Sequence, residues 1–192
     1  MAEEMAEKEG LEGGMKFYPQ LLEWLGVCKH LSYDLTGAIV AYEKCIEATD
    51  KGDSAKQAEL RVKCAGIKMD AGEIDAADRW FAQALEIDPS FPDALLHRSN
   101  LYMLKRDLDN AKKDIEKCLK VKPDFLAAQL RQATLCMHLD QADQALDCLN
   151  LADTLCPKNS DVQVYRGELF FTMGKVRRSV ATRKQTYGSL TT

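Results

Sequence analysis

The stretch ALEIDPSFPDALLHRSNLYM, residues 84–103, carries a helical pattern of apolar residues that two prolines interrupt. The stretch CLKVKPDFLAAQLRQATLCM, residues 118–137, repeats this arrangement 34 residues later. The two stretches share a proline, a leucine and a methionine at equivalent places: Pro89 and Pro123, Leu96 and Leu130, Met103 and Met137. A fixed period of this length is typical of chains that are built from repeated supersecondary units.

Four units of 34 residues result when each of these prolines is placed at position 32 of its unit. The units are 19–52, 58–91, 92–125 and 126–159, and a five-residue insertion, 53–57, follows the first of them. Each proline ends a helix pair, because the residue before a proline is pushed out of the α region. Pro92 also suits the first turn of the next helix, where its missing N–H costs nothing.

Three positions of the unit are restricted in size, which indicates how its two helices pack. Position 8 is always small: Gly26, Ala65, Ser99 and Ala133. Position 20 is always alanine: Ala38, Ala77, Ala111 and Ala145. Position 24 is always large and apolar: Tyr42, Phe81, Ile115 and Leu149. Two antiparallel helices approach closely only where a small side chain faces the partner, and since neither helix buries its apolar face without neighbours, successive units must stack.

This period and these columns resemble the tetratricopeptide repeat over residues 19–174. The resemblance implies an all-α fold, a right-handed α-solenoid of helix–turn–helix repeats. A partial fifth unit starts at residue 160, but its second half departs from the pattern with Ser179, Arg183 and Thr186. We therefore predict an acidic flexible lead-in over 1–18, the repeat array over 19–174 and a basic divergent tail over 175–192.

The composition and the motifs argue against an enzyme or a metal site. The net charge of −4 gives no reason to expect nucleic-acid binding, and no apolar run is long enough to span a membrane. The three histidines lie in different units, and the sequence has no phosphate-binding, dinucleotide-binding or zinc-protease motif. The seven cysteines form no C-x-x-C pair, so we interpret them as free thiols that act as small core residues. We predict no catalytic residues, no metal and no cofactor.

The resemblance also implies a ligand-binding surface, because the first helices of tetratricopeptide units line a concave groove. After the first unit, the ligand-facing positions 5 and 12 are apolar, and methionine recurs there, as on surfaces that accept varied apolar partners. The predicted groove consists of Val62, Met69, Leu96, Asn100, Met103, Leu130, Met137, Val164 and Phe171. An acidic rim suited to a basic segment is predicted at Glu59, Asp70, Asp93, Asp161 and Glu168. The alternative is that the apolar residues only pack neighbouring first helices together.

Residues 56–125 resemble the family of the 70-kDa receptor subunit of the mitochondrial outer-membrane import complex. This resemblance implies a non-enzymatic module that binds a hydrophobic client or preprotein segment, in the cytosol at the face of the mitochondrial outer membrane, without inserting into the membrane itself. A second hypothesis is a cytosolic co-chaperone or scaffold adaptor that uses another face or the basic C-terminal end. No register of the units supplies the lysine, asparagine and arginine set that captures the C-terminal carboxylate of heat-shock chaperones, so a carboxylate clamp is not expected.

Overall fold

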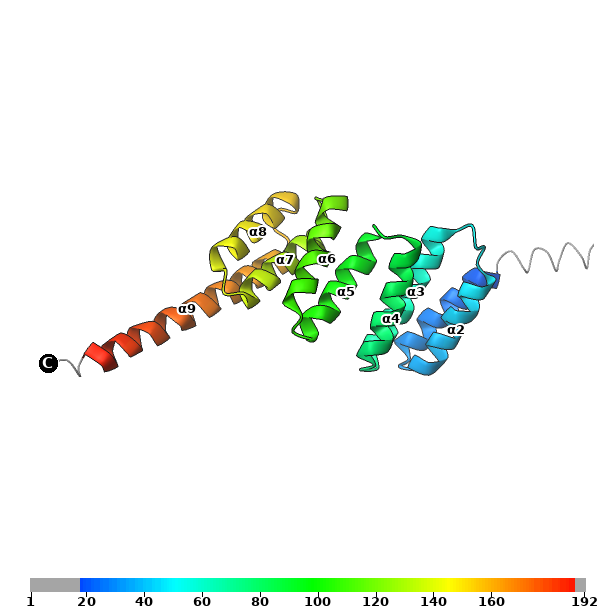
Figure 1. Cartoon of the computed structure of the whole chain (residues 1–192), viewed down its shortest axis with the longest axis horizontal. Helices are drawn as coiled ribbons and strands as arrows, with labels where there is room; N and C mark the ends of the chain where they lie inside the picture. The colour runs from blue at the N-terminus through cyan, green and yellow to red at the C-terminus, as the bar shows by residue number, and fades with distance from the viewer. Residues whose placement is uncertain (1–17, 189–192) are drawn as a thin grey trace, which may run out of the picture. The chain divides into compact units, whose positions relative to one another are not determined.

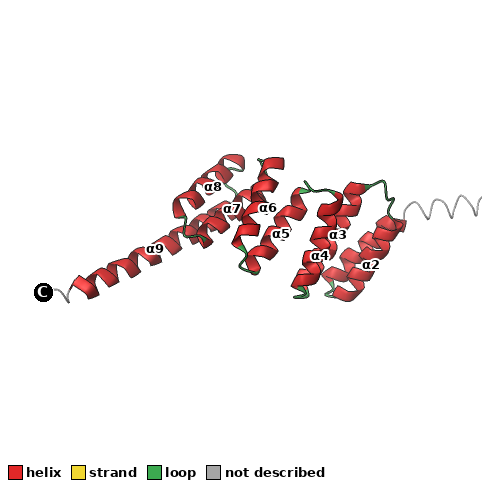
Figure 2. Ribbon diagram, viewed as in Figure 1, coloured by secondary structure: helices red, strands yellow, loops and turns green. Residues whose placement is uncertain are grey.

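The computed structural model describes residues 18–188, with side chains over residues 18–174, and its regular elements within that range are all helices (Figures 1 and 2). A helix over residues 18–31 comes first. The helices that follow are α2 (Leu35–Ala48), α3 (Ser54–Asp70), α4 (Ile74–Ile87), α5 (Pro92–Leu104), α6 (Leu108–Val121), α7 (Leu126–His138), α8 (Ala142–Leu155) and α9 (Ser160–Gly188). The prediction of an all-α fold is confirmed. The predicted lead-in lies outside the described residues, apart from residue 18.

The chain divides into two compact units, Met1–Lys105 and Arg106–Thr192. The described part of the first unit holds the helix over residues 18–31 and helices α2 to α5. The second unit holds helices α6 to α9. Each predicted 34-residue repeat contains two helices, and the prolines lie between helix pairs, with Pro92 in the first turn of α5.

Short polar residues fix where several helices begin. The carboxylates of Asp34, Asp53 and Asp107 accept hydrogen bonds from main-chain N–H groups three residues further on, at 2.9, 3.0 and 3.2 Å. Such caps satisfy donors that the first turn of a helix leaves without partners. Because α3 begins at Ser54, four of the five inserted residues extend this helix by one turn at its start.

The core of the first unit shows the close contacts that the small positions predict. A Cβ added at Gly26 would lie 2.8 Å from the ring of Tyr42, so no larger residue fits there without movement. Ala65, Ala77 and Phe81 are fully buried in one cluster, against which Trp80 and Tyr102 pack. A second cluster joins the helix over residues 18–31 to α2 and α3.

The core of the second unit joins α7, α8 and α9. Ala133 and Ala145, the small residues of the two facing helices, are fully buried beside Leu149. Val162 and Leu169 of α9 complete this cluster. The first helix of the partial fifth unit is therefore held in the same way as the first helices before it.

Helix α9 runs without interruption through the boundary that we placed after residue 174 (Figure 1). The prediction that the repeat array ends at residue 174 and is followed by a basic divergent tail stays a prediction, but the backbone of residues 175–188 continues the helix. The reason is local: residues 175–188 contain no proline, and Gly174 does not adopt a positive φ. The last four residues of the predicted tail, 189–192, lie outside the described residues.

Candidate functional site

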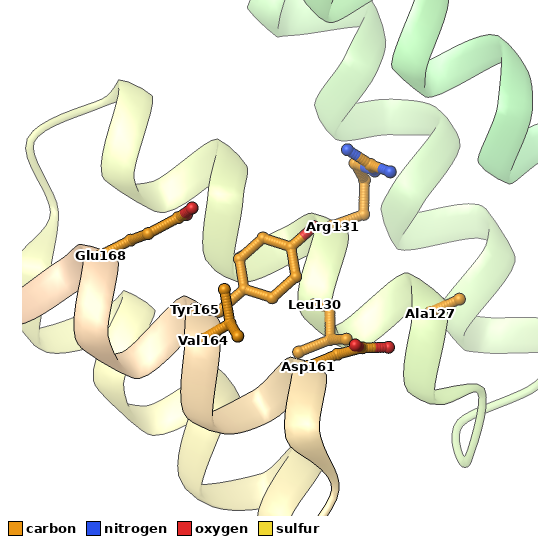
Figure 3. Close-up of a pocket in the computed structure, with 7 residues that line it drawn as sticks. All are labelled: Ala127, Leu130, Arg131, Asp161, Val164, Tyr165 and Glu168. Atoms are coloured by element: carbon orange, nitrogen blue, oxygen red, sulfur yellow. The ribbon is translucent and has the colours of Figure 1, made fainter.

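A pocket of about 410 Å3 opens between α7 and α9 in the second unit (Figure 3). Helix α7 contributes one wall and helix α9 the other. The lining residues are Ala127, Leu130 and Arg131 from α7, and Asp161, Val164, Tyr165 and Glu168 from α9. Its apolar centre is flanked by both acidic and basic groups.

The helical period explains why these residues share one pocket. The α9 residues are spaced i, i+3, i+4 and i+7, which places them on one face of a helix. In the repeat numbering, Leu130 and Val164 both occupy position 5, and Asp161 occupies position 2. The pocket therefore lies on one face of the first helices of two units. The resemblance to tetratricopeptide repeats implies that this face is turned toward ligands.

The two carboxylates of the pocket, on Asp161 and Glu168, have no ion-pair or hydrogen-bond partner within residues 18–174. The neighbouring cation of α9, Arg166, is directed to α8 instead. Its Nη2 donates to Asn150 Oδ1 at 2.8 Å, and its Nη1 lies 3.5 Å from Asp153 Oδ2. The negative charge of the α9 wall is therefore available to a positively charged ligand.

Arg131 supplies a buried donor beside the pocket. Burial lowers the pKa of its guanidinium, an effect that the nearby Tyr165 hydroxyl opposes. Its Nε is buried and donates to no acceptor in the described part of the protein. Figure 3 shows the guanidinium directed away from Asp161, so it does not neutralise that carboxylate. A buried N–H without an acceptor is costly, and this Nε has almost no accessible surface through which a ligand could contact it.

Of the nine predicted groove residues, Leu130 and Val164 line this pocket. Leu130 is 7% exposed and forms part of the core as well as the pocket floor, whereas Val164 is 58% exposed. Met137 packs against the same core and does not line the pocket, and Phe171 is exposed further along α9. Sequence analysis did not single out Ala127, Arg131 or Tyr165. Arg131 and Tyr165 occupy position 6 of their units, next to the ligand-facing position 5. This position in the repeat could have identified them from the sequence.

In the first unit, the predicted groove residues lie on α3 and α5. Val62 and Met69 pack against the cluster around Phe81, as the packing alternative describes. Leu96 is buried, and Asn100 and Met103 are half-buried. A ligand-binding role for these five residues stays a prediction.

Two residues of the predicted acidic rim are paired within the first unit. Lys56 and Lys63 bridge Glu23 and Glu59, with Lys56 Nζ 2.9 Å from Glu23 Oε1 and Lys63 Nζ 2.7 Å from Glu59 Oε1. Burial would raise the pKa of Glu23, but hydrogen bonds from Lys63 and Lys56 outweigh it and lower this pKa. His30 Nε2 lies 2.8 Å from Asp70 Oδ2. Glu59 is therefore held in ion pairs with two lysines and Asp70 contacts His30, whereas the carboxylates of Asp161 and Glu168 have no such partner within residues 18–174.

The remaining polar residues bear on other kinds of site. Within the described residues, no three histidine, cysteine or acidic side chains are grouped so that they could hold a metal ion. The imidazole of His97 stacks on Phe81, with the ring centroids 6.4 Å apart. Burial raises the pKa of the Cys64 thiol to about 12 and that of Cys148 to about 11, which makes both poor nucleophiles. None of the described helices is both long enough and apolar enough to cross a membrane.

The comparisons with known proteins agree with this architecture. The tetratricopeptide repeat family matches residues 92–125. The mitochondrial import receptor subunit TOM70 of Rattus norvegicus is 30% identical over 113 residues, which make up 57% of this chain and 17% of that receptor. The chain thus corresponds to a small part of the length of the curated relatives that it matches.

Solved structures share the fold. A tetratricopeptide repeat protein from Parabacteroides merdae superposes with a TM-score of 0.70 at 23% identity, covering 94% of this chain and 71% of that one. The first tetratricopeptide domain of Spaghetti (RPAP3), solved with the HSP90 peptide SRMEEVD, gives a TM-score of 0.57 at 15% identity over 62% of this chain and 94% of that domain. The chain therefore carries a tetratricopeptide repeat at residues 92–125, within an all-α fold that it shares with tetratricopeptide repeat proteins.

Proposed function

We propose that this chain is a non-enzymatic interaction module that binds an extended or helical segment of a client protein in the pocket between α7 and α9. Tetratricopeptide folds serve protein–protein interaction, and the observation that carries the specific proposal is the chemistry of this pocket. An apolar centre, Leu130 and Val164, lies beside two carboxylates that have no partner within residues 18–174.

The pocket selects a segment in which a basic residue accompanies an apolar one. Burial of a leucine or phenylalanine of the client against Leu130 and Val164 is worth roughly 1.5–3 kcal/mol. Asp161 and Glu168 attract a lysine or arginine of the same segment. These two contacts together favour an amphipathic basic segment.

Mitochondrial protein import is the biological setting that we propose for this activity. The partial likeness to TOM70 over 113 residues supports it, as does the match between an acidic, apolar pocket and a basic amphipathic client segment. In this setting the chain acts in the cytosol, at the face of the mitochondrial outer membrane.

A chaperone adaptor is the second candidate, because a structural neighbour of this chain was solved with the HSP90 peptide SRMEEVD. The negative charge of the pocket would repel that peptide, because the three acidic residues of SRMEEVD would lie near Asp161 and Glu168. A chaperone tail would therefore have to use another surface of the chain. The two candidates differ in the sign of the charge on the preferred peptide.

Fluorescence anisotropy with two labelled peptides separates the candidates. One peptide is a basic amphipathic presequence-like helix, and the other is SRMEEVD. We expect the basic peptide to bind, with an affinity that falls as salt is added. We expect the double variant Asp161→Asn, Glu168→Gln to weaken its binding by about tenfold.

The matched control is the double variant Asp143→Asn, Asp147→Asn on α8, which removes the same charge from exposed positions that do not line the pocket. It should leave binding of the basic peptide nearly unchanged. Equal effects of the two double variants would show that net charge, and not the pocket, controls binding. Tighter binding of SRMEEVD than of the basic peptide would favour the adaptor and contradict the proposal.

A further inference from the structure

The helix over residues 18–31 turns an uncharged face away from α2 and α3. Its charged residues are engaged within the chain, Glu23 with Lys56 and Lys63, and Lys29 with Asp34, and the His30 imidazole lies in hydrogen-bond contact with Asp70. The exposed residues of this helix are all uncharged: Tyr18, Gln20, Leu21, Trp24, Leu25, Val27, Cys28 and Leu31. A helix at the surface of a unit normally carries polar and charged residues on the face opposite the core, so this face departs from the rule.

Four of these residues form a single stripe along the helix. Leu21, Trp24, Cys28 and Leu31 follow one another at intervals of three, four and three residues. This is the spacing of the apolar seam in a pair of coiled helices. Leu21, Trp24 and Leu31 are 65%, 73% and 76% exposed, so the stripe faces solvent and not the core of the unit. The surface is shaped to receive another helix.

The exposed apolar area of this helix approaches what one side of a standard interface buries. The exposed parts of the aromatic, leucine and valine residues of this helix, those outside the stripe included, amount to roughly 600 Å2, which is less than the about 800 Å2 that each partner of a standard interface buries. A contiguous apolar surface of this size is at the upper end of what a monomer usually exposes. Gln20, Cys28 and the helix backbone supply further area.

The stripe is complementary to itself when a second copy runs antiparallel. With the two-fold axis on the stripe, midway between Trp24 and Cys28, Leu21 of one copy faces Leu31 of the other, and the large Trp24 faces the small Cys28. Each contact occurs twice, as a two-fold interface requires. No like charges meet across the pair, because the exposed residues of the helix carry no charge.

We infer that this chain forms a two-fold dimer through the helix over residues 18–31, with the two helices antiparallel. The segment before the helix is a poorer occupant, because five of residues 1–17 are glutamates and would place charge against an apolar face. In Figure 1 the helix (dark blue) lies beside α2, and the contacts of Leu22 and Tyr42 bury its opposite side. The outward side is therefore the one that a partner copy covers.

Sedimentation velocity on the full chain over a concentration series tests the pairing. The wild-type chain is expected to dimerise reversibly. The single variants Leu21→Glu and Leu31→Lys should each raise the dissociation constant by about tenfold or more, because each buries an unpaired charge. Combined in one chain, the two changes should restore the dimer, since antiparallel pairing sets each introduced glutamate against the partner's introduced lysine.

The control is Phe170→Glu, which places the same charge on an exposed apolar residue of α9 and should leave the dimer intact. Alkylation of Cys28 gives a measurement that needs no variant. It is the exposed cysteine of the chain, and its rate of modification should fall as the protein concentration and the dimer fraction rise.

The inference is overturned if the chain is monomeric at every concentration. It is also overturned if Phe170→Glu disrupts the dimer and Leu21→Glu leaves it intact. Single variants that are monomeric together with a double variant that also stays monomeric overturn the antiparallel register. If deletion of residues 1–17 converts a monomeric full chain into a dimer, that segment covers the stripe and the inference is wrong for the full chain. Circular dichroism on every variant confirms that helicity is retained in these comparisons.

Discussion

Gln57, the last of the five inserted residues, holds the end of α2 in place. Its side chain is 7% exposed, and its Nε2 donates to two carbonyl oxygens, that of Ile46 at 2.9 Å and that of Thr49 at 3.1 Å. Its Oε1 accepts a hydrogen bond of 2.6 Å from Arg61 Nη1. One buried amide thus satisfies carbonyls that the last turn of a helix leaves without donors.

Gln57→Met keeps the length of the side chain and removes these hydrogen bonds. Two carbonyls lose their donor, and each buried carbonyl without a partner costs about 1–3 kcal/mol. A pocket beside Gln57, lined by Lys51 and Ser54 among others, lets water reach them, so the lower end of this range applies. Arg61 keeps its second acceptor, the Gln57 carbonyl oxygen at 2.7 Å. We expect the free energy of unfolding to fall by about 2 kcal/mol.

Urea denaturation followed by circular dichroism measures this loss, and Gln129→Met is the matched comparison. Gln129 is buried to a similar degree, but its Nε2 makes a single hydrogen bond, of 3.1 Å, to the Pro123 carbonyl oxygen. Its replacement should cost about 1 kcal/mol. The reasoning is refuted if Gln57→Met changes the free energy of unfolding by less than about 0.5 kcal/mol. It is also refuted if Gln129→Met costs more.

Four further substitutions test predictions about stability, which is measured by thermal or urea denaturation. Gly26→Ala should destabilise the protein by about 1–3 kcal/mol, because the new Cβ meets the Tyr42 ring. Gly167→Ala, in open space on α9, should instead stabilise it by about 0.5–1 kcal/mol, so equal effects would contradict this account. Tyr33→Gly should raise the melting temperature, because Tyr33 holds a φ of 61° at an exposed turn where glycine has no steric penalty; a lower melting temperature would count against it. Because the pKa of Glu23 is lowered in the folded state, its ionised carboxylate stabilises the fold at pH values above the ordinary pKa of 4.5. This stabilisation is lost as the pH falls through the lower pKa of the folded state. The stability of Glu23→Gln should therefore depend less on pH in this range than that of the wild type, and parallel pH profiles would contradict the assignment.

Much of the fold was predictable from the sequence because its determinants are local. Three features are visible in the sequence because they depend on residue spacing and backbone sterics. They are the period of 34 residues, the alanine at position 20 of the four units and the prolines between helix pairs. The sequence showed Gly26 at a small position and Tyr42 at a large one, and the structure packs them against each other. The sequence showed residues 53–57 as an insertion. It did not show that they add a turn to α3 or that Gln57 donates hydrogen bonds to the end of α2.

The candidate site was predictable in part. The ligand-facing rule of the repeat identified Leu130, Val164, Asp161 and Glu168, which line one pocket in the structure. The same rule also selected Val62, Met69 and Met137, which pack against core clusters. A periodic pattern shows which side chains share a face of a helix, but it does not show how deeply a neighbouring helix covers that face.

The sequence by itself determined the all-α class, the helix pairs and the small-and-large packing between them, since these follow from residue size and spacing within about 34 residues. The tertiary structure decided which charges are free: Glu59 is paired with two lysines, whereas Asp161 and Glu168 have no partner within residues 18–174. It also decided that α9 continues past residue 174 and that Leu21, Trp24 and Leu31 face outward. The physical reason is that exposure and ion pairing depend on which element lies against a side chain, and residues far apart in the sequence supply that element.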